Sequence, residues 1–371
     1  MLKLTWLGLV LLICASNGLT QPDNSKNFED AYQEFLKELK ENPASNKIGE
    51  LALNALELGE ALYNEGSEDL AVLTFNVVRS VSGHPRWFNM LEGRSVELNR
   101  LALNRYKKVY GLKSDRLIDP YANLIITLSR ESGKPERYKN LGNKTIKTEI
   151  KQMIAEVERN VFSQKIEPLK VAGFYKRLAV SNLKERGSFA KKALAIFQKE
   201  LGEGALETLK AKLIWFSTLS MKRRVKGYQE MLPLMENLPE LKTQRYLVHQ
   251  VLSAFYFQTK KEQEAEYHLQ RAGEAGQGLF SEQDYLPIMK VAPKYPRRAL
   301  NRGIRGYVVV EFAVTEEGSV ETPIVVESSP KGIFDRAAID AALLFRYVPT
   351  YEQGRAVRVE GVRNKMTFDF E

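Results

Sequence analysis

Few residues of this chain have the types and spacing that chemistry at an active site requires. Its three histidines, His84, His249 and His268, are far apart in the sequence, and its single cysteine is Cys14. No His-Glu-x-x-His, phosphate-binding loop, dinucleotide-binding glycine pattern or Gly-x-Ser-x-Gly occurs. The Ser-Gly-Lys-Pro that starts at Ser132 has the wrong neighbours for phosphate binding. The sequence therefore predicts no enzyme, no catalytic residue, no metal site and no cofactor.

The composition narrows the class of protein further. The chain has 371 residues, enough for two or three domains, and its 44% hydrophobic and 27% charged residues are typical of globular proteins. A net charge of +9 would suit nucleic acid, an anionic lipid or a cell-wall polymer as partner. No run of five or six like charges and no nucleic-acid-binding motif occurs, so we expect no nucleic-acid partner.

Among the possible functions, binding of a protein partner remains. The sequence pattern that indicates it covers residues 291–370. A short helix is predicted from Tyr295-Pro296, with Pro at its first position, to Gly303. Gly306 then begins a strand in which apolar residues alternate. We expect one face of this strand to carry Val308, Val310, Phe312 and Val314, and the other Tyr307, Val309, Glu311 and Ala313.

A second strand, a helix and a last strand complete this region. A tight turn with Gly318 leads into the second strand, residues 320–328, whose Pro323 cannot donate to a ladder and favours a sheet edge. The last strand is predicted over residues 357–370, after a turn at Gln353-Gly354. The apolar stripe of the helix is predicted to be Phe334, Ala337, Ala338, Ala341, Leu344 and Phe345.

Several of these motifs together resemble the C-terminal domain of the TonB family. They are the Tyr-Pro pair, the two glycines, the valine-rich hairpin, Ser-Ser, Phe-Asp-x-Ala-Ala at Phe334, Tyr-x-Pro at Tyr347 and a last strand with Phe368. The resemblance implies a domain that adds the TonB box of outer-membrane receptors as a strand to its sheet edge. In that family the inner-membrane ExbB–ExbD proteins supply the proton-driven force.

Carried over to this chain, the resemblance implies a receiving edge on the last strand. The charged residues Arg358, Arg363 and Lys365 would protect this edge from self-pairing. A homodimer through the same strand stays open as an alternative. The expected partner-binding residues are Tyr295, Pro296, Val362, Arg363, Asn364, Lys365, Met366, Thr367 and Phe368.

The residues between Phe28 and Ala272 read as helices in pairs. Leu58-Gly59, Leu62, Gly66, Ala71 and Phe75 follow the spacing of a tetratricopeptide unit. In such a unit Gly59 and Ala71 would let the two helices approach closely, and Gly66 would make the turn between them. Two further segments, residues 178–197 and 252–272, resemble this unit but lack some of its expected residues. A non-repeating helical domain is the alternative. Stacked pairs would form a partner-binding surface, with ExbB–ExbD or another envelope protein as candidates.

The N-terminus resembles a secretory signal peptide. Lys3 precedes about a dozen apolar residues, and the small residues Ser16 and Gly18 would allow a cut after Gly18. The apolar run is short for a membrane span, which needs about 20 residues. We expect a periplasmic protein, and a short uncleaved signal anchor in the inner membrane stays open.

The predicted chain is thus multi-domain. Residues 1–18 form the signal peptide or anchor, residues 19–280 an α-helical, tetratricopeptide-like solenoid, and residues 285–371 a small α+β domain with a three-stranded antiparallel sheet and two helices. Helices stand where TonB proteins carry a Pro-rich spacer. The expected function is TonB-dependent outer-membrane transport of siderophores or nutrients. The alternative is a periplasmic scaffold that binds another envelope partner without energy transduction.

Overall fold

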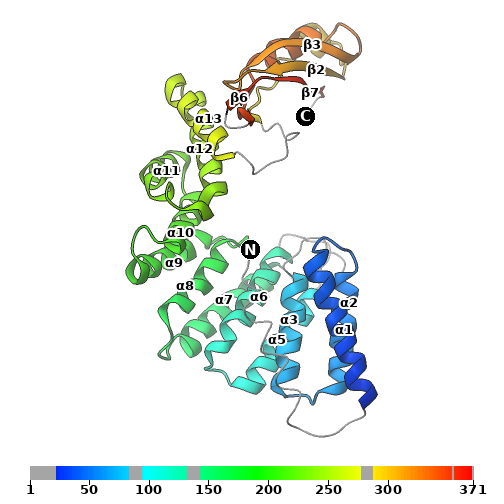
Figure 1. Cartoon of the computed structure of the whole chain (residues 1–371), viewed down its shortest axis with the longest axis vertical. Helices are drawn as coiled ribbons and strands as arrows, with labels where there is room; N and C mark the ends of the chain where they lie inside the picture. The colour runs from blue at the N-terminus through cyan, green and yellow to red at the C-terminus, as the bar shows by residue number, and fades with distance from the viewer. Residues whose placement is uncertain (1–21, 83–93, 132–142, 277–286, 353–354, 370–371) are drawn as a thin grey trace. The chain divides into compact units, whose positions relative to one another are not determined.

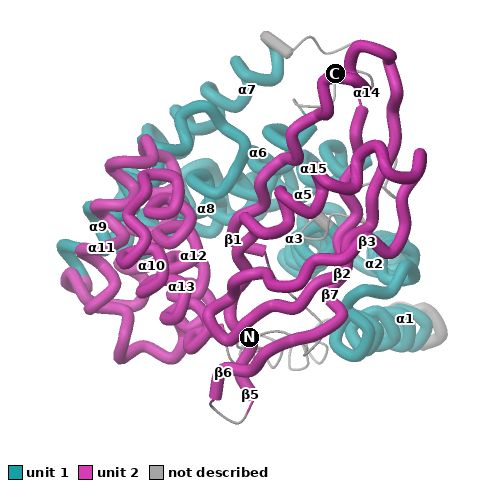
Figure 2. Tube along the Cα trace, turned by 90° about the horizontal axis from the view of Figure 1, so that it is seen from above, with its two compact units in different colours: residues 1–200 teal, residues 201–371 magenta. Residues whose placement is uncertain are grey.

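The computed structural model describes residues 22–82, 94–131, 143–276, 287–352 and 355–369. The expected signal segment at residues 1–18, His84 and the Ser-Gly-Lys-Pro motif lie outside the described residues. The chain divides into two compact units, residues 1–200 and residues 201–371 (Figure 2). The expected domain boundary near residue 280 stays a prediction.

The first unit consists of helices that follow one another along the chain (Figure 1). Neighbouring helices pack against each other, because each has an apolar stripe that it can bury only against another element. The elements are α1 (Pro22–Glu41), α2 (Ile48–Leu62), α3 (Glu68–Ser82), α5 (Arg94–Tyr110), η2 (Asp115–Leu117), α6 (Ile118–Glu131), α7 (Asn143–Glu156), the π-helical turn η3 (Val157–Val161), α8 (Pro168–Ala179) and α9 (Arg186–Leu201).

The glycines of the α2–α3 hairpin have the roles that the sequence predicted. Gly66 turns the chain between the two helices with a φ of +96°, a conformation that costs glycine little. Gly59 faces Leu73 of α3 so closely that a Cβ on Gly59 would lie 2.1 Å from Leu73 Cδ2. Close approach of the two helices is therefore confirmed, whereas the assignment to tetratricopeptide repeats stays a prediction.

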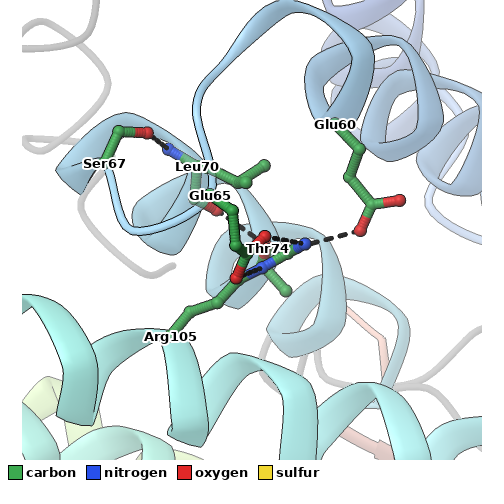
Figure 3. Close-up of polar contacts among 6 residues, drawn as sticks. All are labelled: Glu60, Glu65, Ser67, Leu70, Thr74 and Arg105. Carbon is green, nitrogen blue, oxygen red and sulfur yellow. Dashed lines mark hydrogen bonds and ion pairs between the residues drawn. The ribbon is translucent and has the colours of Figure 1, made fainter.

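A buried arginine ties this hairpin to the next helix (Figure 3). Arg105 of α5 is only 7% exposed, and its Nη1 donates to Thr74 Oγ1 at 2.7 Å and pairs with Glu60 at 2.9 Å. Both Nε and Nη2 of Arg105 donate to the carboxylate of Glu65, at 3.4 and 2.9 Å. The hydrogen bond from Arg105 keeps the pKa of Glu65 below its usual value. The several donors of one guanidinium thus make polar contacts with three side chains of the hairpin at once.

The second unit begins with two helix pairs. They are α10 (Leu206–Ser217), α11 (Met221–Met235), the 3₁₀ turn η4 (Pro239–Leu241), α12 (Lys242–Gln258) and α13 (Glu262–Gly276). The α12–α13 pair brings His249 and His268 together, with 2.9 Å between their Nδ1 atoms, and the ring of Tyr256 stacks on His268. No described helix is long and apolar enough to cross a membrane.

The second unit ends in a small α+β domain. Its main sheet is antiparallel with the order β3-β2-β7, so β2 (Gly306–Val314) lies between β3 (Val320–Ser329) and β7 (Val359–Phe368) (Figure 1). The predicted three-stranded antiparallel sheet is confirmed, as is the edge position of the strand that carries Pro323. The short helices are α14 (Arg297–Asn301) and α15 (Asp335–Ala342).

The core of this domain follows the predicted alternation. Val308, Val310, Phe312 and Val314 of β2 are all buried, together with Phe334, Ala338, Ala341 and Phe345 from the region of α15. Gly318 makes the β2–β3 turn with a φ of +83°, as predicted. Because β2 contributes every second residue to this core, its register is fixed relative to both neighbours.

Three details of this region were predicted wrongly. Leu344 is 51% exposed because α15 ends at Ala342 and the chain turns before it. Pro296 caps α14 and is not its first helical residue. The predicted last strand corresponds to β7 but was started too early, because Val357 ends a separate strand, β6 (Arg355–Val357), and β7 begins at Val359. Two small pairings, of β1 (Pro287–Met289) with β4 (Arg346–Tyr347) and of β5 (Thr350–Glu352) with β6, were not predicted.

Candidate functional site

The candidate site is the outer edge of β7. This strand pairs with β2 from Val359↔Val314 to Phe368↔Gly306, with one irregularity in the register between Phe312 and Val314. Among the described strands no other pairs with β7. Successive residues of a strand direct their N–H and C=O groups to opposite sides, so alternate residues of β7 present these groups away from β2. The edge therefore offers a row of main-chain donors and acceptors to an extended peptide.

The apolar residues of β7 anchor the strand in its own domain. Val362, Met366 and Phe368 are each at most 5% exposed. The ring of Phe368 stacks on Phe334 with 4.3 Å between centroids. These three residues were predicted to bind a partner, and the structure leaves only their main-chain groups for that role.

The charged residues of β7 make contacts across the outer face of the sheet. Arg363 pairs with Glu311 of β2 at 2.6 Å. Lys365 Nζ lies 3.9 Å from the centroid of the Tyr307 ring, and the Tyr307 hydroxyl donates to Glu327 of β3 at 2.5 Å. This hydrogen bond to a carboxylate raises the pKa of Tyr307. The two cations thus stabilise the three-strand register as cross-strand pairs do.

Arg358 was predicted to protect the edge together with Arg363 and Lys365. It pairs with Glu321 of β3 at 2.6 Å and with Glu360 at 2.5 Å. Hydrogen bonds to these two carboxylates raise the pKa of Arg358 further above its usual value. All three cations are therefore engaged by carboxylates or an aromatic ring of the domain itself.

Asn364 lies on the side of β7 that faces the helices and is half-buried. Its Oδ1 accepts a hydrogen bond of 2.6 Å from Lys290 Nζ, and this Nζ also lies 6.0 Å from the centroid of the Phe345 ring. Lys290 directly follows β1, so the segment that enters the domain reaches the middle of β7. No local pattern in the sequence predicts this contact, since 74 residues separate its partners.

Tyr295 joins the entering segment to the end of β7. Its ring packs edge-on against Phe334 and Phe368, with centroid distances of 5.5 and 5.7 Å. Its hydroxyl donates to the carbonyl of Ile304 at 2.5 Å. The structure therefore brings Tyr295, the neighbouring Pro296 and Phe368 together at one end of the edge. Val362 and Arg363 lie further along the strand, and Thr367 is exposed next to Phe368.

The described residues contain no group of three or more His, Cys, Asp or Glu side chains that could hold a metal ion. The geometry thus defines a small α+β module with a pre-formed sheet edge, whose unpaired main-chain groups are of the kind to which an added strand can bind.

The comparison with known proteins identifies this module. Residues 291–370 match the family described as Gram-negative bacterial TonB protein C-terminal, so this part of the chain is a TonB C-terminal domain. Protein TonB of Pseudomonas aeruginosa is 37% identical over 80 residues, which are 22% of this chain and 23% of that protein. The chain thus matches less than a quarter of the length of this curated relative.

Two solved structures are also similar. The solution NMR structure of the Pseudomonas aeruginosa TonB C-terminal domain has 33% identity and a TM-score of 0.22, and covers 25% of this chain and 92% of that chain. The crystal structure of BtubC (BKLC) from P. vanneervenii has 16% identity and a TM-score of 0.37, and covers 71% of this chain and 96% of that chain.

Proposed function

We propose that this chain takes part in TonB-dependent transport across the outer membrane, as a periplasmic protein that captures a receptor peptide. The peptide would add as a fourth strand along β7 of the C-terminal sheet. The observation that carries the proposal is the edge position of β7 in a domain of the TonB C-terminal family. The role is one of binding and transport, with no catalytic step.

The construction of β7 supports main-chain recognition. Its apolar side chains are buried in the domain and its cations are paired across the sheet, so the strand is ordered before a partner arrives. A pre-formed edge leaves the entropic cost of ordering to the incoming peptide alone, which favours binding. Side chains near the end of the edge, such as Thr367 and the Tyr295-Pro296 region, would supply selectivity.

Proline substitutions in β7 test the proposal. Asn364 and Thr367 are three residues apart, so the N–H of one points to β2 and the N–H of the other points to the open edge. Proline removes a donor at either position. We expect one proline variant to lose binding of a TonB-box peptide at least about tenfold, roughly the value of one lost hydrogen bond, while the sheet stays folded. The other proline variant should disrupt the β2–β7 ladder itself.

Peptide affinity is measured by calorimetry on the full chain, and the ladder by hydrogen exchange of β2 and β7. Asn364→Ala and Thr367→Ala are the matched controls. They keep the main-chain N–H at the substituted position and should still bind the peptide. Equal peptide binding by the wild type and by a folded outward-facing proline variant would show that β7 is not the docking edge. A folded wild type that binds no TonB-box peptide would favour the alternative, a scaffold that binds another envelope partner.

A further inference from the structure

The first unit contains a pocket that strand capture does not use. It has a volume of about 320 Å³ and lies among α3, α6 and α8. This volume is at the lower end of the range for small-molecule sites, about 300–1,000 Å³. Its lining includes three arginines, Arg79, Arg130 and Arg177, and one acidic residue, Asp119. The positive charge in the pocket thus exceeds the negative charge.

Arg177 is held in place at the pocket wall. Its Nη1 donates to Asp119 Oδ1 at 2.6 Å, and its Nη2 donates to Asn123 Oδ1 at 2.8 Å. The amide nitrogen of Asn123 in turn donates to Asn99 Oδ1 at 3.2 Å. A guanidinium fixed by two side chains of α6 needs little reordering when a ligand binds, which favours affinity.

Arg79 reaches the same pocket from α3 and is exposed. Within the described part of the chain it makes no hydrogen bond or ion pair. Burial is the largest cause that lowers the pKa of Arg177, and the charge of Arg79 acts in the same direction, so the two guanidiniums repel each other. An anion between them would relieve this repulsion and accept hydrogen bonds from both.

From this geometry we propose that the α3–α6–α8 pocket binds a small oxyanion ligand, one that carries a phosphate or carboxylate group. The exposed Arg79 would attract the anion from solvent, and Arg177, held by Asp119 and Asn123, would bind it in a fixed orientation. The pocket volume suits a single compact anion or one anionic end of a larger molecule. This inference concerns the helical unit and does not rest on strand capture by β7.

Calorimetric titration of the full chain tests the proposal, with pyrophosphate as the phosphate probe and citrate as the carboxylate probe. We expect saturable binding of at least one probe, and the tighter one identifies the preferred group. Arg79→Gln should weaken that binding by at least about tenfold, because a charged donor is lost. Arg79→Lys, which keeps the charge, should retain most of it. Binding should also weaken as salt is added.

The matched control is Arg94→Gln, which removes an exposed arginine of the same unit that does not line the pocket. Thermal unfolding of each variant shows whether the helical unit stays intact. The proposal is overturned if neither probe binds saturably to the wild type. It is also overturned if Arg79→Gln and Arg94→Gln weaken binding equally.

Discussion

Gly303, which precedes β2, and Gly306, the first residue of β2, are expected to tolerate alanine very differently. A Cβ on Gly306 would lie 2.0 Å from the carbonyl oxygen of Ser329, 2.8 Å from Pro330 Cδ and 2.9 Å from Phe334 Cε2. Real Cβ atoms essentially never come within 3.0 Å of another group, so the β2 and β3 backbones would have to separate by at least 1 Å here. A Cβ on Gly303 would meet nothing within 4 Å, but the φ of this residue is +63°.

The magnitudes follow from these two geometries. Overpacking of a well-packed site costs about 1–3 kcal/mol and sometimes more, and at Gly306 the atom that must move belongs to the backbone of a paired strand. We therefore expect Gly306→Ala to destabilise the C-terminal domain by about 3 kcal/mol. Gly303→Ala only forces alanine into the left-handed region, which costs about 1–2 kcal/mol.

Hydrogen exchange measured by mass spectrometry on the full chain reports the stability of β2, β3 and β7 separately from the helices. A loss of about 3 kcal/mol corresponds to a decrease in protection of roughly a hundredfold or more. Gly303→Ala, as the control, should decrease protection by about tenfold. If Gly306→Ala lost no more protection than Gly303→Ala, the close approach of Gly306 to Ser329 would not be a constraint on the sheet.

Two further predictions concern the helices. Arg105→Met should lower the free energy of unfolding of the first unit by about 1–3 kcal/mol, since Thr74 and Glu65 lose their donor. The control Arg116→Met removes an exposed arginine paired with Glu68 and should cost under about 1 kcal/mol. Urea denaturation measures both losses, and equal losses would contradict the role of the buried Arg105. The second concerns pH: burial, and for His249 also the charge of its neighbour, lowers the pKa of His249 to about 3 and that of His268 to about 4. Below about pH 6.5 the histidines of the unfolded chain bind protons and the folded pair does not, so the contribution of the pair to the free energy of unfolding should be constant above this pH and fall as the pH decreases toward 4, by up to about 1.4 kcal/mol per pH unit for each histidine. Urea denaturation between pH 7.5 and 5 should show this dependence of the free energy of unfolding on pH, and the double variant His249→Gln/His268→Gln should lack it. Identical slopes for the two proteins would refute the argument.

The sequence predicted those parts of the fold that have a strong local signal. The alternating valines of β2 and the glycine at position 318 specify a hairpin, and both have the predicted place in the structure. The pairings β1–β4 and β5–β6 involve strands of two or three residues, which are too short to show any periodicity. Leu344 was assigned to the core because the helical spacing was extended beyond the true end of α15.

The candidate site was predictable only in part, for a similar reason. Pro323 predicted that its own strand, β3, lies at an edge of the sheet. The resemblance to the TonB domain predicted that β7 forms the other edge. The side-chain partners of β7 depend on tertiary contacts between distant residues, such as Lys290 with Asn364 and Arg363 with Glu311. The His249–His268 pair is likewise a product of the α12–α13 pairing, which local sequence patterns do not encode.

The contacts of β7 also limit how a partner can be selected. Buried residues hold one face of the strand, and ion pairs with β2 occupy Arg363 on the other. A peptide that added to this edge would therefore meet few free charges along the strand, and its main chain would supply most of the affinity. Under this proposal, selectivity would come from the ends of the edge, where Tyr295 packs against Phe368 and where Thr367 is exposed. Substitutions at those ends should change which peptide binds, whereas substitutions of the paired cations should mainly change the stability of the sheet.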